Sequence, residues 1–423
     1  MRGVLAAGVV LAGVIAVNGG NYAANLISAR YLGPAAYGDL VALLALSALV
    51  GLPLGALQIF TSRYVARFSA QGDMDATRFL ARRGVRLTLI GGVVLTVALD
   101  AAIPVIRSSL GIATTLGILL VNVLALPNLV TPVVWGVVQG LQRFRVLSAS
   151  MAAGTFVRLV VLVPLLAAGA GVSGALGAAL IGSIASLAIP LIVLRAWFAP
   201  PQTAGERVPT REAATYLVPV AVGILAITSL SSIDVLVAKA SFGGATAGVY
   251  GSASLIGRLV LYIPTAIVTV LLPKVAARSA DGRETARLLA MSLAVTLVIG
   301  GIATATYAGL SHFIVSAAFG KKYEAAGSLL WMFAVAMTAY AIMNVFLYYH
   351  LGRGNTRVAW FLLAGAIVQG IVYTFFHTSP HELVEASMCV GWALVGAELI
   401  AISIAGIGPA REPRAPQSDL TNA

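Results

Sequence analysis

The chain has 423 residues, of which 59% are apolar and only 10% are charged, and its mean hydropathy is +0.96. Soluble domains carry about a quarter charged residues, so this composition excludes a soluble globular protein, a disordered chain and a nucleic-acid-binding domain. The net charge of +12 does not indicate a nucleic-acid partner, because the basic residues lie in short segments between long apolar runs, as they do in membrane proteins.

Twelve apolar runs are long enough to cross a bilayer, which takes about 20 helical residues. They must be helices, since a spanning segment has to pair its own backbone groups inside lipid. The predicted fold class is therefore an all-α membrane protein with twelve transmembrane helices. In chain order the predicted spans are 4–28, 38–60, 85–106, 114–138, 147–167, 172–194, 213–236, 247–272, 286–309, 327–349, 358–376 and 383–407.

The basic residues are distributed unevenly between the two sides of the predicted membrane. The termini and even-numbered loops hold twenty Lys and Arg, whereas the odd-numbered loops hold five. By the positive-inside rule, both termini face the cytoplasm and the protein is a multi-pass protein of the cytoplasmic membrane. The remaining two arginines, Arg158 and Arg258, fall within predicted helices.

The two halves of the chain repeat one another. Three short matches recur in the same order at offsets of 209 to 213 residues: 29–38 with 238–251, 63–67 with 274–278, and 140–145 with 351–357. Because each repeat contains an even number of spans, both halves enter the membrane from the same side. They are therefore related by a pseudo-two-fold axis along the membrane normal. Transporters of that plan bind substrate between the halves.

A polar segment with three prolines, 199–212, separates the two repeats. We predict an N-terminal six-helix bundle over 1–198, a cytoplasmic linker over 199–212 and a C-terminal six-helix bundle over 213–407. The polar end of the chain, 408–423, is predicted to be a disordered cytoplasmic tail.

Polar residues inside the apolar runs mark candidate binding positions. Asn18, Asn21 and Asn25 share one face of the first helix, and we expect them to line a water-filled cavity. Hydrogen bonding between helices is the alternative explanation. Arg30 and Lys239 stand at equivalent repeat positions toward the predicted outer end, either in a shared role or extending to outer headgroups.

Arg258 is the best single candidate for contacting an anionic ligand. It lies in the middle of the eighth predicted helix, too far from either end to reach water easily. The alternative is a buried ion pair with Asp234 or Asp100.

Four acids are candidates for ion coupling or charge pairing. Asp39 and Asp234 lie near Arg30 and Lys239 in the sequence, whereas Asp100 and Glu398 fall within predicted helices. The helical acids either bind a coupling proton or cation or neutralise the buried arginines, and neutralisation is the favoured interpretation.

The sequence does not indicate an enzyme, a cofactor or a metal site. A G-x-G-x-x-G pattern at 169–174 joins two predicted membrane helices and follows no strand, which a dinucleotide site requires. His377 and His381 are separated by Pro380 in a loop, a poor arrangement for metal ligands. Cys389 is the only cysteine, so an intramolecular disulfide is excluded.

Several motifs resemble those of one transporter family. The run A-R-Y-L-G-P-A-A-Y-G (29–38) resembles the motif that follows the first helix in the polysaccharide-transport branch, the Wzx-like oligosaccharide flippases, of the multidrug/oligosaccharidyl-lipid/polysaccharide (MOP) flippase superfamily. Residues 137–145, 233–239, 248–251 and 319–323 are similar to other segments of that branch.

The resemblance implies a MATE-like fold and a flippase that moves an undecaprenyl-diphosphate-linked oligosaccharide across the cytoplasmic membrane by alternating access, for cell-surface polysaccharide synthesis. Arginines of a cationic central cavity would hold the diphosphate. By motif position Arg30, Arg63 and Lys239 carry over, and the burial argument adds Arg258. The implied partners are the lipid-linked substrate, membrane lipids and other polysaccharide-assembly proteins.

Three alternatives remain open on the sequence alone. A multidrug or cation antiporter of the same fold would need a cavity dominated by acids and aromatic residues, whereas the ionisable residues here tilt basic. A membrane glycan polymerase or ligase typically has a long outer loop, and the predicted outer loops are short. A non-transporting scaffold for glycan assembly is the third alternative.

Overall fold

The computed structural model describes residues 2–51, 55–112, 114–198, 210–262 and 282–405, and these form helices joined by short turns, with no strand among them. The predicted linker is thus largely outside the described residues, and the predicted C-terminal tail wholly so. The first half contains α1 (Arg2–Gly51), α2 (Gly55–Ala70), α3 (Met74–Ala101), α4 (Ile103–Leu110), α5 (Thr115–Gly140), α6 (Phe144–Ala167), α7 (Gly171–Val193) and the short η2 (Arg195–Phe198). The second half contains α8 (Thr210–Ser241), α9 (Gly244–Gly257), α10 (Leu259–Tyr262), α12 (Gly282–Phe319), η3 (Lys321–Ala326), α13 (Gly327–Gly352), α14 (Arg357–Phe375) and α15 (Pro380–Ala405).

Ten of the described helical segments are long and apolar enough to cross a membrane, which makes the chain a multi-pass membrane protein. One of them, Val17–Leu49, contains residues 17–28 of the first predicted span and 38–49 of the second. The eighth predicted span corresponds to α9 and α10, and its remainder lies outside the described residues. The total of twelve spans therefore stays a prediction.

α1 contains two helices that meet at a sharp kink at Gly33 (φ 71°, ψ 172°), inside the predicted loop between the first two spans. A positive φ favours glycine, and Pro34, which cannot donate a backbone hydrogen bond, restarts the helix immediately after it. The third predicted span, in contrast, is interrupted within its length, since α3 ends at Ala101 and α4 begins at Ile103.

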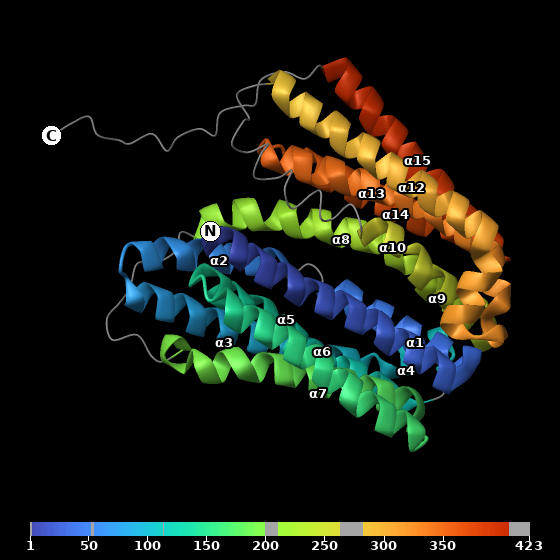
Figure 1. Cartoon of the computed structure of the whole chain (residues 1–423), viewed down its shortest axis with the longest axis horizontal. Helices are drawn as coiled ribbons and strands as arrows, with labels where there is room; N and C mark the ends of the chain where they lie inside the picture. Colours follow the sequence, from blue (N-terminus) through green and yellow to red (C-terminus); the bar gives the residue numbers. More distant parts are fainter. Residues whose placement is uncertain (1, 52–54, 113, 199–209, 263–281, 406–423) are drawn as a thin grey trace.

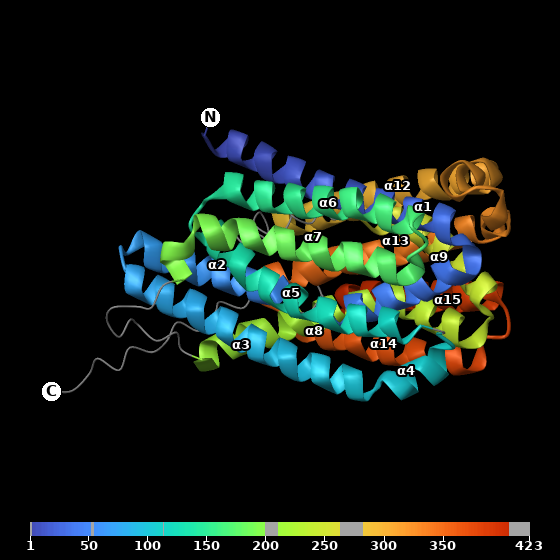
Figure 2. The same ribbon diagram turned by 90° about the horizontal axis from the view of Figure 1, so that it is seen from below.

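The helices form two groups (Figure 1), one containing α1 to α7 and the other α8 to α15. Within the first group α1 packs on α6, α2 on α5, and α6 on α7; within the second α12 and α15 pack on α13, and α14 packs on α8. The groups meet where α1 lies against α8 and α9 and where α2 lies against α8. Figure 2 shows the same bundle turned by 90°, with the helices running along its length.

Small residues let helices approach closely inside each group. The sequence predicts a close-packing face on the sixth helix, formed by Gly174, Ala178, Gly182 and Ser186. Two of these, Gly182 and Ser186 in α7, lie against Gly154 of α6, where an added methyl would approach the Ser186 Cβ to 2.7 Å.

The two groups also have large apolar faces that carry exposed side chains. Only 11% of the apolar window of α3 and 22% of that of α12 is buried, whereas 89% of the window containing α13 is buried. Burial of α13 on all sides makes it the centre of the second group, while α3 and α12 present the surface expected to face lipid.

Candidate functional site

The candidate site lies on the surface where the two groups of helices meet. Here the backbones of α1 and α9 touch, because glycines occupy both sides. An added methyl on Gly248 would lie 1.8 Å from the carbonyl oxygen of Pro34, and one on Gly38 would lie 2.6 Å from that of Gly244. The halves are therefore closed against each other at this end of the molecule.

An ion pair joins the halves at the same end. Lys239 of α8 contacts Asp39 of α1 with Nζ and Oδ1 2.6 Å apart, and the two side chains are only 5% and 16% exposed. Lys239 therefore does not extend to headgroups. The sequence places Asp234 near Lys239, but the structure pairs Lys239 with an acid of the other half.

Arg30 also bridges the halves. Its guanidinium donates hydrogen bonds to the carbonyl oxygens of Ala317 and Ala318 in α12, with the Nε contact to Ala318 at 3.0 Å. In the opposite direction, the Tyr323 hydroxyl of η3 donates to the carbonyl of Ala29 at 2.8 Å. The repeat-related pair Arg30 and Lys239 thus holds the two halves together from opposite sides.

Arg258 lies at the break between α9 and α10 and is largely buried. Its Nη2 is 3.4 Å from Oδ1 of Asp234, which matches the alternative explanation of a buried ion pair. Asp234 also accepts a hydrogen bond from the Tyr250 hydroxyl at 3.0 Å. Among the described residues, the Nε of Arg258 and the Oγ of nearby Ser254 are buried without a hydrogen-bond partner, so this Nε is an unused donor there.

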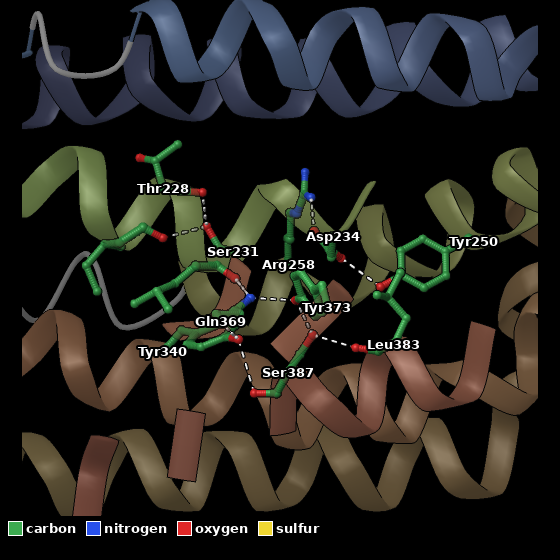
Figure 3. A network of polar contacts seen from close by, with 12 residues as sticks. Thr228, Ser231, Asp234, Tyr250, Arg258, Tyr340, Gln369, Tyr373, Leu383 and Ser387 are labelled. Atoms are coloured by element: carbon green, nitrogen blue, oxygen red, sulfur yellow. Dashed lines mark hydrogen bonds and ion pairs between the residues drawn. The ribbon is translucent and has the colours of Figure 1, made fainter. Parts of the chain in front are cut away.

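A second polar network lies beside this ion pair in the second half (Figure 3). The Gln369 amide donates to the carbonyl of Leu230 at 2.9 Å and to the Tyr373 hydroxyl, and the Tyr340 hydroxyl lies 2.9 Å from its Oε1. Ser387 lies 2.6 Å from the Tyr373 hydroxyl. Sequence reasoning missed this network, although the spacing of Gln369 and Tyr373 by four residues in one helix was the available signal.

The asparagine stripe of α1 binds another buried arginine. Arg158 of α6 donates from Nη1 to Oδ1 of Asn21 at 2.7 Å, and the Asn25 amide donates to the Asn21 carbonyl at 2.8 Å. Asn18 and Asn21 are exposed, while Arg158 Nε is buried without a partner. Hydrogen bonding between helices is therefore present, and the lining of a wet cavity stays a prediction.

Three further predicted residues lie elsewhere on the helices. Arg63 is exposed on α2, which neighbours α3 and α5 of its own half and α8 of the other half. Asp100 accepts a hydrogen bond from the Asn122 amide at 2.7 Å, and Glu398 lies 2.7 Å from Nε2 of His350. These two helical acids contact an amide and a histidine, not the buried arginines.

The described residues hold no group of three or more His, Cys, Asp or Glu side chains that could bind a metal ion. At the meeting surface Lys239 is paired with Asp39 and Arg258 with Asp234, whereas Arg30 is bound by backbone carbonyls. Such pairs can open and re-form when an anion or cation competes for one member.

Comparison with known proteins gives structural matches only, since no family model and no curated protein sequence matches the chain. A multidrug resistance MATE family transporter of the MOP superfamily in its inward-facing conformation superposes with a TM-score of 0.77 at 17% identity, over 91% of this chain and 94% of that one. The lipid II flippase MurJ in an inward closed conformation gives 0.72 at 12% identity, over 95% and 87%. The chain has the fold of the MOP superfamily transporters.

A third match is to a structure in another conformation. An outward-facing structure of a multidrug resistance MATE family transporter superposes with a TM-score of only 0.63, at 18% identity and over 94% of both chains. The predicted MATE-like, two-bundle fold is confirmed by both MATE family structures.

Proposed function

We propose that this chain is a flippase that moves an undecaprenyl-diphosphate-linked oligosaccharide from the cytoplasmic to the outer leaflet of the cell membrane, in the service of surface polysaccharide synthesis. The motif resemblance to the polysaccharide-transport branch supports this substrate class. The MOP fold supports the coarser statement that the chain is a transporter.

The observation that carries the proposal is the set of basic side chains where the halves meet. Three basic side chains lie at this surface or beside the polar network next to it. They are Arg30 of α1, Lys239 of α8 and Arg258 at the end of α9. A diphosphate carries several negative charges on oxygens that arginine binds bidentately. A site for a cationic drug would need the opposite charge balance.

The ion pairs supply a way to bind and release an anion. Without substrate, Asp234 and Asp39 balance Arg258 and Lys239. An arriving diphosphate competes with these carboxylates for the basic groups, so substrate binding loosens the contacts that hold the halves together. The glycan and diphosphate then cross between the halves while the prenyl tail stays in lipid.

The direction of opening follows from the loop charges. The contacts of Arg30 and Lys239 lie at the end of the odd-numbered loops, which the positive-inside rule assigns to the outer face. A molecule closed at that end takes its substrate from the cytoplasmic side.

The test uses Arg258. Replacing it alone leaves Asp234 buried with an unbalanced charge, which destabilises a protein by about 3–5 kcal/mol. The double variant Arg258→Ala/Asp234→Asn removes both charges, and we expect normal abundance in the membrane with loss of glycan flipping. Asp234→Asn alone is the matched control: it keeps the arginine but also leaves one charge unbalanced, so flipping is compared per molecule of folded protein in the membrane and should be retained.

The assay follows a polyprenyl-diphosphate disaccharide in proteoliposomes, and its outcome separates the alternatives. Full flipping by the double variant would remove Arg258 from the site. Transport of cationic drugs without flipping by the unaltered protein would support the antiporter, and glycan polymerisation would support the enzyme. Neither activity, with binding to assembly proteins, would support the scaffold.

A further inference from the structure

A row of arginines lies on the outside of the first half, away from the meeting surface. Arg82, Arg83 and Arg86 of α3 are all exposed. The main neighbours of α3 are α2, α4, α5 and η2, which all belong to the first half, and Figure 2 shows α3 and α4 along one edge of the molecule. These arginines are therefore not part of the proposed transport route.

The same face of α3 continues into an exposed apolar surface. Arg82 and Arg86 are followed at helical spacing by Ile90, Val93 and Val97, which are 50%, 48% and 62% exposed. Large apolar side chains exposed to this extent on a membrane helix face lipid tails. The arginines stand at the end of that lipid-facing stripe, where the headgroups begin.

The spacing along the chain agrees with the thickness of a bilayer. Arg86 and Arg107 of α4 bracket 20 residues, 87–106, that contain no Lys or Arg and a single acid, Asp100, which is bound by Asn122. At 1.5 Å per helical residue this interval spans about 30 Å, the thickness of the hydrocarbon core. Arg86 therefore lies at the headgroup level and Arg82 and Arg83 just beyond it.

The nearby acids are engaged by other groups, and the three guanidinium groups of Arg82, Arg83 and Arg86 are exposed. Asp75 is the nearest acid in the helix, and it pairs with Arg78 at 3.4 Å, while Arg78 also donates to the carbonyl of Ala196. Arg83 lies over the ring of Phe79, 5.6 Å from its centroid, which holds the guanidinium against the helix. The carboxylates at this end of α3 are Asp73, which caps the helix, and Asp75.

We propose that Arg82, Arg83 and Arg86 form a docking surface for the phosphate headgroup of an anionic glycerophospholipid. Arg82 and Arg86 are four residues apart on one face and Arg83 adjoins Arg82, so the three guanidinium groups are within reach of one headgroup while its acyl chains lie along Ile90, Val93 and Val97. The bound lipid occupies the leaflet on the side of the even-numbered loops, and its binding fixes the level of the first half in the membrane.

The experiment measures lipid retention by the full-length protein in neutral detergent. Native mass spectrometry counts molecules of phosphatidylglycerol bound during a titration, with phosphatidylcholine of the same acyl chains as the uncharged probe. Each basic residue near a membrane surface contributes about fivefold to the affinity, so Arg82→Gln/Arg83→Gln/Arg86→Gln should weaken phosphatidylglycerol binding on the order of 100-fold. Phosphatidylcholine binding should not change.

Two further variants keep the test decisive. Arg143→Gln/Arg145→Gln/Arg195→Gln removes three other exposed arginines at the same end of the molecule and should retain the lipid. Arg82→Lys/Arg83→Lys/Arg86→Lys keeps the charge and should recover most of the binding, which excludes misfolding as the cause of the loss.

Three results would overturn the proposal. Undiminished phosphatidylglycerol binding by the α3 glutamine variant would remove these arginines from the site. An equal loss in the control triple variant would indicate a general charge effect. Competition by inorganic phosphate at the concentration of the lipid would indicate a site for a free anion, not for a membrane headgroup.

Discussion

Lys239 and Asp39 are the residues whose contact depends most directly on the two halves being closed. The pair is largely buried and joins α8 to α1, so removing either partner leaves an unbalanced charge in a poorly hydrated place. We expect Lys239→Ala and Asp39→Ala each to shift the protein toward a form that is open at this end. The exchange Lys239→Asp/Asp39→Lys should restore much of the closed form.

Spin labels on the two halves near this end would measure the closed and open populations of all four proteins. The double-mutant cycle should give a coupling free energy of about 1–3 kcal/mol. A coupling near zero would mean that the pair forms without holding the halves together.

At the residue scale, sequence reasoning was most successful within one half. The ion pair of Arg258 with Asp234 was one of two stated alternatives, because both residues lie in neighbouring apolar runs of one repeat. The partner of Lys239 and the partner of Arg30 could not be predicted. Both contacts cross between halves, and their formation depends on how the halves dock and not on local spacing.

At the scale of helices, the crossing of α1 and α9 depends on glycine. We expect Gly248→Ala to destabilise the closed molecule by about 1–3 kcal/mol, because the new methyl would lie 1.8 Å from a backbone oxygen that cannot turn aside. A lowered melting temperature in detergent would measure the effect.

Gly19→Ala is the matched control for that substitution. Gly19 is also a helical glycine, in α1, but an added methyl would have no neighbour within 4 Å. The control should be neutral or slightly stabilising, since alanine favours the helix. Equal melting temperatures for the two variants would contradict the close approach of α1 and α9.

The helices themselves were largely predictable from hydropathy, because a bilayer demands about 20 apolar residues whatever the tertiary structure. The breaks in them were only partly predictable. The kink at Gly33 falls inside the loop predicted between the first two spans, whereas Arg258 stands at the end of α9 where an unbroken helix was expected. The first break follows from the local sequence of Gly33 and Pro34, and apolar length alone gives no sign of the second.

At the scale of the whole molecule, the repeat predicted two related bundles, and the confirmed fold has them. The tyrosines of the repeated Y-G pairs are both fully buried, but their partners differ: Tyr37 packs across the halves on Tyr323 and Phe319, whereas Tyr250 packs on Phe333 of its own half. The repeat does not indicate which substrate is transported. The proposal of a lipid-linked oligosaccharide depends on the basic residues between the bundles and on the motif resemblance.

The central claim is that the two halves separate at the Lys239 end to release substrate. A disulfide across that end tests it most directly. Ala35 and Gly244 suit this purpose, since a Cβ added to Gly244 would lie 3.6 Å from the Ala35 Cα. The variant Ala35→Cys/Gly244→Cys is made with Cys389→Ser, which removes the native thiol. A matched disulfide within one half, Ser150→Cys/Ser186→Cys, uses two hydroxyls that lie 3.2 Å apart.

Flipping of a polyprenyl-diphosphate disaccharide in proteoliposomes is then measured before and after reduction. We expect the cross-link between the halves to stop flipping in proportion to the fraction cross-linked, with recovery on reduction, and the cross-link within one half to leave flipping unchanged. Undiminished flipping by the Ala35→Cys/Gly244→Cys variant, when it is fully cross-linked between the halves, would contradict the account.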